Sequence, residues 1–179
     1  MGDDPRLTPL PAAAWDDTVR DALRPLLPPE RADPRDAGNV LATLVRHPGL
    51  AKGYLELNAH LLVHSTLSPR VREVALLRAV QARGSEYLWD HHVPIAQRAG
   101  LTTADIDEWR HGRAVDEVDA LTVRVADELD ELNTVSDATW SALQAHFDER
   151  QILDLIFTIG CYQLLAVAVN VLGIQPEGR

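Results

Sequence analysis

The segment from Ser68 to Gly100 constrains the fold more than any other part of this 179-residue chain. Ser68 is a favourable N-cap, and Pro69 suits the first helical position after it. Gly84 and Gly100 supply the backbone freedom that a helix end needs. The segment therefore predicts two helices joined by a tight turn, a helix hairpin at the centre of the sequence.

Each predicted helix has one apolar face that a single titratable group interrupts. In the first helix the face consists of Glu73, Leu76, Leu77 and Val80. In the second helix it consists of Leu88, His92, Ile95 and Ala99. Glu73 and His92 lie at comparable distances from the turn, given a helical rise of about 1.5 Å per residue. We expect antiparallel packing of the two helices to bring these side chains together.

A carboxylate and an imidazole in an apolar seam are sufficient for general acid–base chemistry. The alternative is a buried, hydrogen-bonded pair that serves packing alone. Titratable groups that converge in a protein interior occur more often at functional sites. We therefore favour Glu73 and His92 as catalytic residues.

Composition indicates one compact globular domain, with 46% hydrophobic and 25% charged residues. The formal net charge of −10 argues against binding to nucleic acid or to an anionic membrane, because both need a basic surface. Cys161 is the one cysteine, so an intramolecular disulfide is excluded, and no secretory signal pattern opens the sequence. These features predict a cytoplasmic protein.

The rest of the chain has helical periodicity, without the alternation that predicts strands. Residues 1–14 contain several prolines and are expected to form a flexible lead-in, so that the domain spans 15–179. Asn39 is expected to cap a helix that Pro48 ends. The predicted fold is all-α, a single-domain bundle of about eight helices.

The last predicted helix, residues 151–172, is apolar on almost every side. Such a pattern normally indicates a helix buried all round, in the core or in a subunit interface. Its length also permits a membrane span, but Asp154, Gln163 and Asn170 interrupt the apolar run. We therefore predict a buried C-terminal helix and no membrane contact.

His60 and His64 have the i, i+4 spacing of metal ligands on a helix. Leu61 follows the first histidine, where a zinc protease motif has glutamate, and no acidic residue lies between the two. We therefore predict no metal site, and we keep His60 as a candidate pocket residue.

The central hairpin resembles the core motif of the carboxymuconolactone decarboxylase and alkylhydroperoxidase D-like superfamily. That motif has an Arg-x-Arg-Glu helix, a turn, then Glu-Tyr-x-Trp-x-x-His, followed by Ala and Gly-Leu. The matching residues are Arg70, Arg72, Glu73, Glu86, Tyr87, Trp89, His92, Ala96, Gly100 and Leu101. The resemblance extends over roughly 67–173. It implies an all-α, alkylhydroperoxidase D-like fold and a homo-oligomer, such as a trimer, hexamer or dimer.

The peroxidase branch of this superfamily carries a Cys-x-x-Cys pair, and Ser85 and Leu88 occupy those positions here. Peroxidase chemistry of that kind needs a thiolate and a resolving thiol. The resemblance therefore favours the decarboxylase branch, which lacks the pair. It implies a lyase without cofactor that acts on a small carboxylated or lactone substrate. His92 would be the general acid or base, and Glu73 would orient it.

Four further residues are candidates for substrate binding: Ser85, Trp89, Tyr87 and His60. Ser85 either lines the pocket or simply caps the second helix. Trp89 either contacts substrate or packs in the core or in a subunit interface. Tyr87 lies on a different face of the predicted helix from His92, which favours solvent or a subunit contact for it. Three arginines could bind a substrate carboxylate or could be exposed helix charges, and the sequence does not decide between these roles: Arg70, Arg72 and Arg78.

Two other functions compete with the lyase. One is an alkylhydroperoxidase-like oxidoreductase that works through an external thiol, for which Cys161 is the available cysteine. The other is a non-catalytic, small-molecule-binding oligomer in which Glu73 and His92 form a structural pair.

Overall fold

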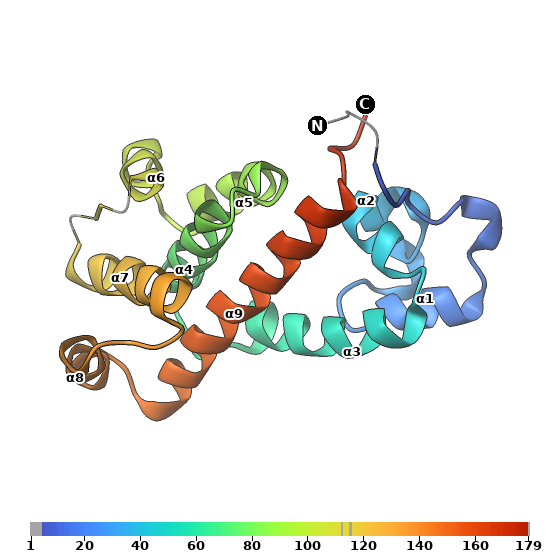
Figure 1. The fold of residues 1–179 in the computed structure, drawn as a ribbon. Helices are drawn as coiled ribbons and strands as arrows, with labels where there is room; N and C mark the ends of the chain where they lie inside the picture. Colours follow the sequence, from blue (N-terminus) through green and yellow to red (C-terminus); the bar gives the residue numbers. More distant parts are fainter. Residues whose placement is uncertain (1–4, 112, 115, 179) are drawn as a thin grey trace. The chain divides into compact units, whose positions relative to one another are not determined.

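The α-helices of the chain follow one another without strands over the residues that the computed structural model describes, 5–111, 113–114 and 116–178 (Figure 1). The all-α prediction is confirmed, with nine α-helices in that part of the chain. They are α1 (Asp17–Leu23), α2 (Pro34–Leu44), α3 (Pro48–Ala59), α4 (Pro69–Ala82), α5 (Glu86–Arg98), α6 (Thr103–Arg110), α7 (Glu117–Leu132), α8 (Asp137–His146) and α9 (Glu149–Leu172). Short 3₁₀ turns lie at Ala12–Ala14 and Pro29–Arg31, and a π-helical turn, His60–His64, follows α3.

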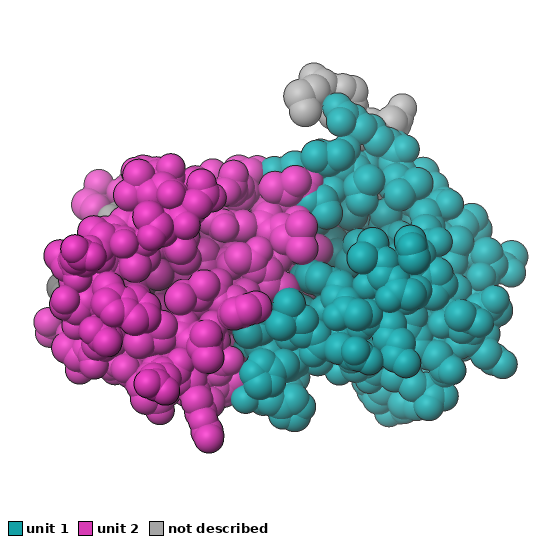
Figure 2. Space-filling view, turned by 60° about the horizontal axis from the view of Figure 1, so that its bottom comes forward, with its two compact units in different colours: residues 1–64, 168–179 teal, residues 65–167 magenta. Residues whose placement is uncertain are grey.

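The chain divides into two compact units, which Figure 2 shows in different colours. The first unit comprises residues 1–64 and 168–179, and the second comprises 65–167. The second unit contains α4 to α8 and most of α9, and therefore both predicted catalytic residues.

In the first unit, α1 packs on α3 around an apolar cluster that includes Trp15, Leu23 and Leu55. Helix α2 begins earlier than predicted, because the Asp33 side chain caps it by accepting hydrogen bonds from the amides of residues 35 and 36. Gly38, with φ of +65°, interrupts the helix, and regular helix resumes at Asn39. The sequence therefore predicted the second part of α2 and missed its first turn.

The predicted lead-in makes backbone hydrogen bonds within the first unit. The Leu10 amide donates to the Ala42 carbonyl at 2.7 Å, and the Arg6 amide donates to the Leu172 carbonyl at 2.9 Å. The domain boundary between residues 14 and 15 stays a prediction.

Helix α4 is the central element of the second unit, and it packs on α5, α6 and α7. One run of its residues is completely buried, each 0% exposed: Glu73, Val74, Ala75, Leu76, Leu77, Ala79 and Val80. A helix buried on so many sides explains why its sequence is apolar beyond a single stripe.

Helix α9 is buried on one side and exposed on the other within the single chain, so it is not a core helix on every side, and burial of the exposed side in a subunit interface stays a prediction. Its buried residues include Leu155, Ile159, Tyr162 and Ala166. Its exposed apolar residues include Leu153, Phe157, Leu164 and Val167. The Asp154 carboxylate accepts a hydrogen bond from the Thr66 amide at 2.6 Å, which explains an acidic residue in an apolar helix.

Among the described residues, α9 is the helix long and apolar enough to cross a membrane by length and composition. Just over half of its most apolar window is buried within the protein. Core helices of soluble proteins meet the same criterion, so this finding is weak evidence for a membrane span.

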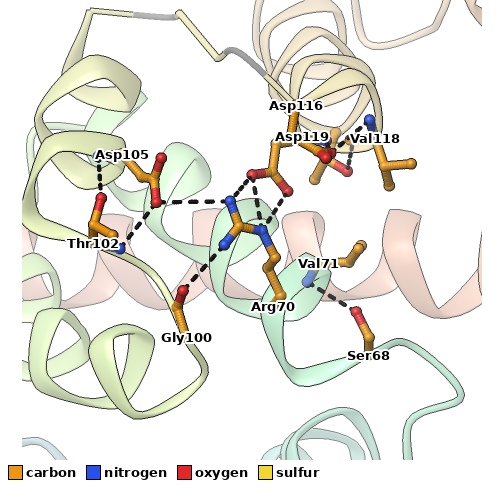
Figure 3. A network of polar contacts seen from close by, with 10 residues as sticks. Ser68, Arg70, Val71, Gly100, Thr102, Asp105, Asp116, Val118 and Asp119 are labelled. Carbon is orange, nitrogen blue, oxygen red and sulfur yellow. Dashed lines mark hydrogen bonds and ion pairs between the residues drawn. The ribbon is translucent and has the colours of Figure 1, made fainter.

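An ionic network around Arg70 ties the start of α4 to α6 and α7 (Figure 3). The guanidinium donates to the Asp119 carboxylate at 2.6 Å and to the Gly100 carbonyl at 3.2 Å, and Asp105 lies 3.7 Å away. Burial raises the pKa of Asp119 above 3.8, and the hydrogen bonds from Arg70 offset only part of that rise. The same contact raises the pKa of Arg70.

Replacing Arg70 with Ala is expected to lower the free energy of unfolding by about 3 kcal/mol at pH 7, because Asp119 would remain buried without its cation. An acid whose pKa is raised on folding binds more protons in the folded state, so the ionised form opposes folding. The deficit should therefore shrink as the pH falls from 7 towards 4. Urea denaturation at several pH values tests this, with the exposed Arg98→Ala as control; an equal deficit at every pH would contradict it.

Candidate active site

The hairpin that carries the site forms as the sequence predicts. Ser68 caps α4, its hydroxyl accepting a hydrogen bond from the Val71 amide at 3.3 Å. After α4, Gly84 adopts φ of +62°, which favours glycine, and the Ser85 amide donates to the Val80 carbonyl at 3.0 Å. This tight turn reverses the chain, so α5 packs against α4.

Glu73 and His92 meet between these two helices. The Nδ1 atom of His92 lies 3.1 Å from Oε2 of Glu73. Glu73 is 0% exposed and His92 is 5% exposed, so water is largely excluded from the pair. Ion pairing and hydrogen bonding are stronger in such a place than in water. The predicted meeting of the two groups in a sheltered seam is confirmed.

Three further residues, which the sequence did not place beside the pair, contact it. Nε of Arg72 lies 3.4 Å from Oε1 of Glu73, so both carboxylate oxygens are in contact with a nitrogen donor. The Tyr162 ring packs edge-on against the His92 ring, with centroids 5.1 Å apart and an interplanar angle of 87°. The exposed ring of His91 makes a second edge contact with His92 at 5.3 Å.

Ser85 shares the inward face of α5 with His92, seven residues away. It occupies the N-cap position of α5, but its side chain makes no capping hydrogen bond. Its hydroxyl is buried and has no hydrogen-bond partner among the described residues. The capping interpretation of Ser85 is therefore wrong, whereas its role in substrate binding stays a prediction.

Trp89 lies on the same face of α5 and is 3% exposed. The Arg110 guanidinium of α6 stacks over its ring, 4.2 Å from the centroid. This cation–π contact gives the indole a packing function inside the second unit. A contact of Trp89 with substrate stays a prediction.

Tyr87 and His60 are the two remaining candidates, and a contact of either residue with substrate stays a prediction. Tyr87 is half-buried on the opposite face of α5 from His92. His60 belongs to the first unit, in the π-helical turn after α3, and its role stays a prediction.

A hollow of about 430 Å³ in the second unit lies away from this pair, between residues 113–114 and α7. None of the predicted site residues lines it. Among the described residues, no cluster of three or more His, Cys, Asp or Glu is arranged to hold a metal ion. The expected hollow beside His92 stays a prediction.

The missed residues differ in the signal that the sequence offers. Arg72 precedes Glu73 in α4. Adjacent helical residues point about 100° apart, so helical periodicity did not predict that the Arg72 side chain contacts Glu73. Tyr162 lies on α9, far from His92 in sequence, and only tertiary packing brings the two rings together.

Comparison with known proteins agrees with the resemblance of the central hairpin. Residues 48–131 match the family described as Carboxymuconolactone decarboxylase family. No curated protein sequence matches the chain. The matched region contains α4, α5, Glu73 and His92.

Solved structures show the same fold over nearly the whole chain. An alkylhydroperoxidase AhpD core protein, an uncharacterized peroxidase-related protein from Ralstonia eutropha JMP134, has a TM-score of 0.78 and 18% identity, over 96% of this chain and 93% of that chain. An uncharacterized peroxidase-related protein from Silicibacter sp. TM1040 has a TM-score of 0.76 and 14% identity, over 99% of this chain and 96% of that chain.

The debrominase Bmp8 has a TM-score of 0.70 and 15% identity, over 96% of this chain and 92% of its own. A cysteine-to-alanine variant of Bmp8 was solved in complex with 2,3,4-tribromopyrrole. At such identities these likenesses establish the fold and leave the reaction open. Residues 48–131 are therefore similar to the carboxymuconolactone decarboxylase family, and the chain has the alkylhydroperoxidase D-like fold.

Proposed function

We propose that this protein is a cofactor-independent lyase that decarboxylates a small carboxylated or lactone substrate, or catalyses a closely related acid–base reaction on it. The observation that carries the proposal is the buried hydrogen bond between His92 and Glu73. A carboxylate behind an imidazole fixes the ring and stabilises its protonated form.

In the proposed mechanism the two nitrogens of His92 have separate roles. With Glu73 ionised, Nδ1 carries the hydrogen and donates it to Oε2 across 3.1 Å. No described residue accepts or donates a hydrogen bond at Nε2, so this atom is available to substrate. The assignment makes Nε2 the atom that moves the proton.

A decarboxylation at this site balances without an oxidant or a metal. The bond between carbon and the carboxylate breaks, carbon dioxide leaves, and the electron pair stays on the substrate as an enolate-like carbanion. The imidazolium Nε2–H of His92 then protonates that carbon, and water returns a proton to Nε2. Glu73 holds the ring in place throughout.

A peroxidase-like oxidoreductase is the second candidate, because the fold is shared with peroxidase-related proteins and with the debrominase Bmp8. A thiol reaction in this chain would depend on Cys161, which is 5% exposed. Unchanged peroxide-dependent activity in Cys161→Ala would remove this candidate. The third candidate is the non-catalytic, small-molecule-binding oligomer.

The proposal includes a cytoplasmic homo-oligomer without nucleic-acid or membrane partners. The net charge of −10 supports the absence of nucleic-acid binding, because a polyanion would be repelled. The oligomer is carried over from the family resemblance.

The test is an assay of the protein, dialysed against EDTA, with a panel of lactone acids and β-keto acids in D₂O. We expect carbon dioxide release from at least one substrate and deuterium at the carbon that bore the carboxylate. Neither release nor solvent exchange with any substrate of the panel would contradict the lyase and favour the binding oligomer.

A further inference from the structure

We propose that Arg72 is the anion-binding residue of this site and that it takes a carboxylate of the substrate. The inference deepens the proposed function, since it adds a substrate-binding residue beside His92. The sequence contains three arginines of α4 that are candidates for this role, and their hydrogen bonds in the structure distinguish Arg72 from the other two.

Two of the three arginines each bind both a carboxylate of α7 and a backbone carbonyl. Arg70 donates to Asp119 and to the Gly100 carbonyl (Figure 3). Arg78 donates from Nε to Asp127 and from Nη1 to the Trp109 carbonyl at 3.1 Å. An arginine whose charge and donors are satisfied in this way serves the fold and has little left for a ligand.

Arg72 is different because most of its donors are unused. Its described polar contact is the 3.4 Å approach of Nε to Glu73 Oε1. No described residue accepts a hydrogen bond from Nη1 or Nη2, although an arginine has five N–H donors. The side chain is 16% exposed, so it is mostly removed from water yet reachable by a small ligand. A partly buried cation with unused donors gains when an acceptor arrives.

The position of Arg72 puts that acceptor next to the reacting imidazole. Arg72 and His92 contact opposite oxygens of the same Glu73 carboxylate, so the two side chains lie within the length of a small organic acid. The planar fork of Nη1 and Nη2 matches the two oxygens of a carboxylate. A substrate held by this fork would be oriented relative to Nε2 of His92.

The charges of the site favour an anionic ligand. Glu73 and Arg72 balance each other, and a protonated His92 adds one positive charge in a place that is nearly closed to water. A substrate carboxylate neutralises this excess, whereas an uncharged analogue leaves it uncompensated.

The experiment measures binding without turnover, with glutarate and its uncharged diamide, glutaramide, as probes. Calorimetry gives the affinity, and the side-chain NMR signals of His92 report whether the probe lies beside the imidazole. The variants are Arg72→Gln, Arg72→Lys and the matched control Arg98→Gln, which removes one charge from an exposed position of α5. Near-ultraviolet circular dichroism verifies that each variant is folded.

We expect glutarate, and not glutaramide, to bind and to shift the His92 signals. Arg72→Gln should weaken glutarate about tenfold to a hundredfold, the effect of losing a charge-assisted hydrogen bond. The affinity of Arg72→Lys for glutarate should lie between those of the wild type and Arg72→Gln, because lysine keeps the positive charge but lacks the planar pair of donors. Arg98→Gln should change nothing.

Three results would overturn the inference: no glutarate binding to the wild type, unchanged affinity in Arg72→Gln, or an equal loss in Arg98→Gln. Failure of the proposed lyase is distinguishable, because it leaves carboxylate binding at Arg72 intact and abolishes only the catalytic readout.

Discussion

Replacing His92 with Ala is expected to lower turnover by about 10²–10⁴-fold, the usual contribution of a general acid or base. The reason is that Nε2 of this residue supplies the proton in the proposed mechanism, and no other imidazole in the described structure is hydrogen-bonded to Glu73. Steady-state kinetics on the substrate found in the panel assay measure the loss.

The matched control is His146→Ala, which removes an imidazole of α8 whose described partner is Glu117. Its turnover should equal that of the wild type. Both variants should keep the helical circular dichroism spectrum. Wild-type turnover in a folded His92→Ala protein would exclude His92 as the proton donor.

Replacing Glu73 with Leu is expected to reduce the free energy of unfolding by about 3–5 kcal/mol, because it breaks a buried pair and leaves one partner behind. The double variant Glu73→Leu/His92→Leu should be much more stable than Glu73→Leu. Arg72 loses its contact with Glu73 in both variants, so the effect of that loss cancels when the two variants are compared.

Urea denaturation of the wild type, Glu73→Leu, His92→Leu and the double variant gives the coupling energy between Glu73 and His92. If the changes in the free energy of unfolding of the two single variants add up to that of the double variant, the contact between the side chains does not contribute to stability. A stable and still active double variant would refute the catalytic assignment. A stable and inactive one is the expected combination, since polar pairs at active sites are kept for chemistry rather than for stability.

The helix hairpin and the Glu73–His92 contact were predictable because they depend on local rules. Helical periodicity sets which side chains share a face, and the glycine turn at Gly84 sets which faces oppose each other. The meeting of the two groups then follows from their similar distances to the turn. Here short-range sequence signals were sufficient for a tertiary contact.

Other features depended on packing that the sequence does not encode locally. The preference of serine for N-caps predicted a capping Ser85, yet its hydroxyl is turned inward and buried. The nearly uniform apolar sequence of α9 did not reveal which side is exposed. The contact of Tyr162 with His92 joins α9 to α5, and only the folded chain brings them together.

The two contacts of Glu73 have a further consequence for the rate of the proposed reaction. Arg72 and His92 hold its two oxygens in the folded chain before any substrate arrives. The carboxylate is held by these two contacts and is 0% exposed, so it has little water to lose when the imidazole becomes charged. Reorganisation of the site is therefore completed during folding, and it adds little to the activation barrier of each catalytic cycle.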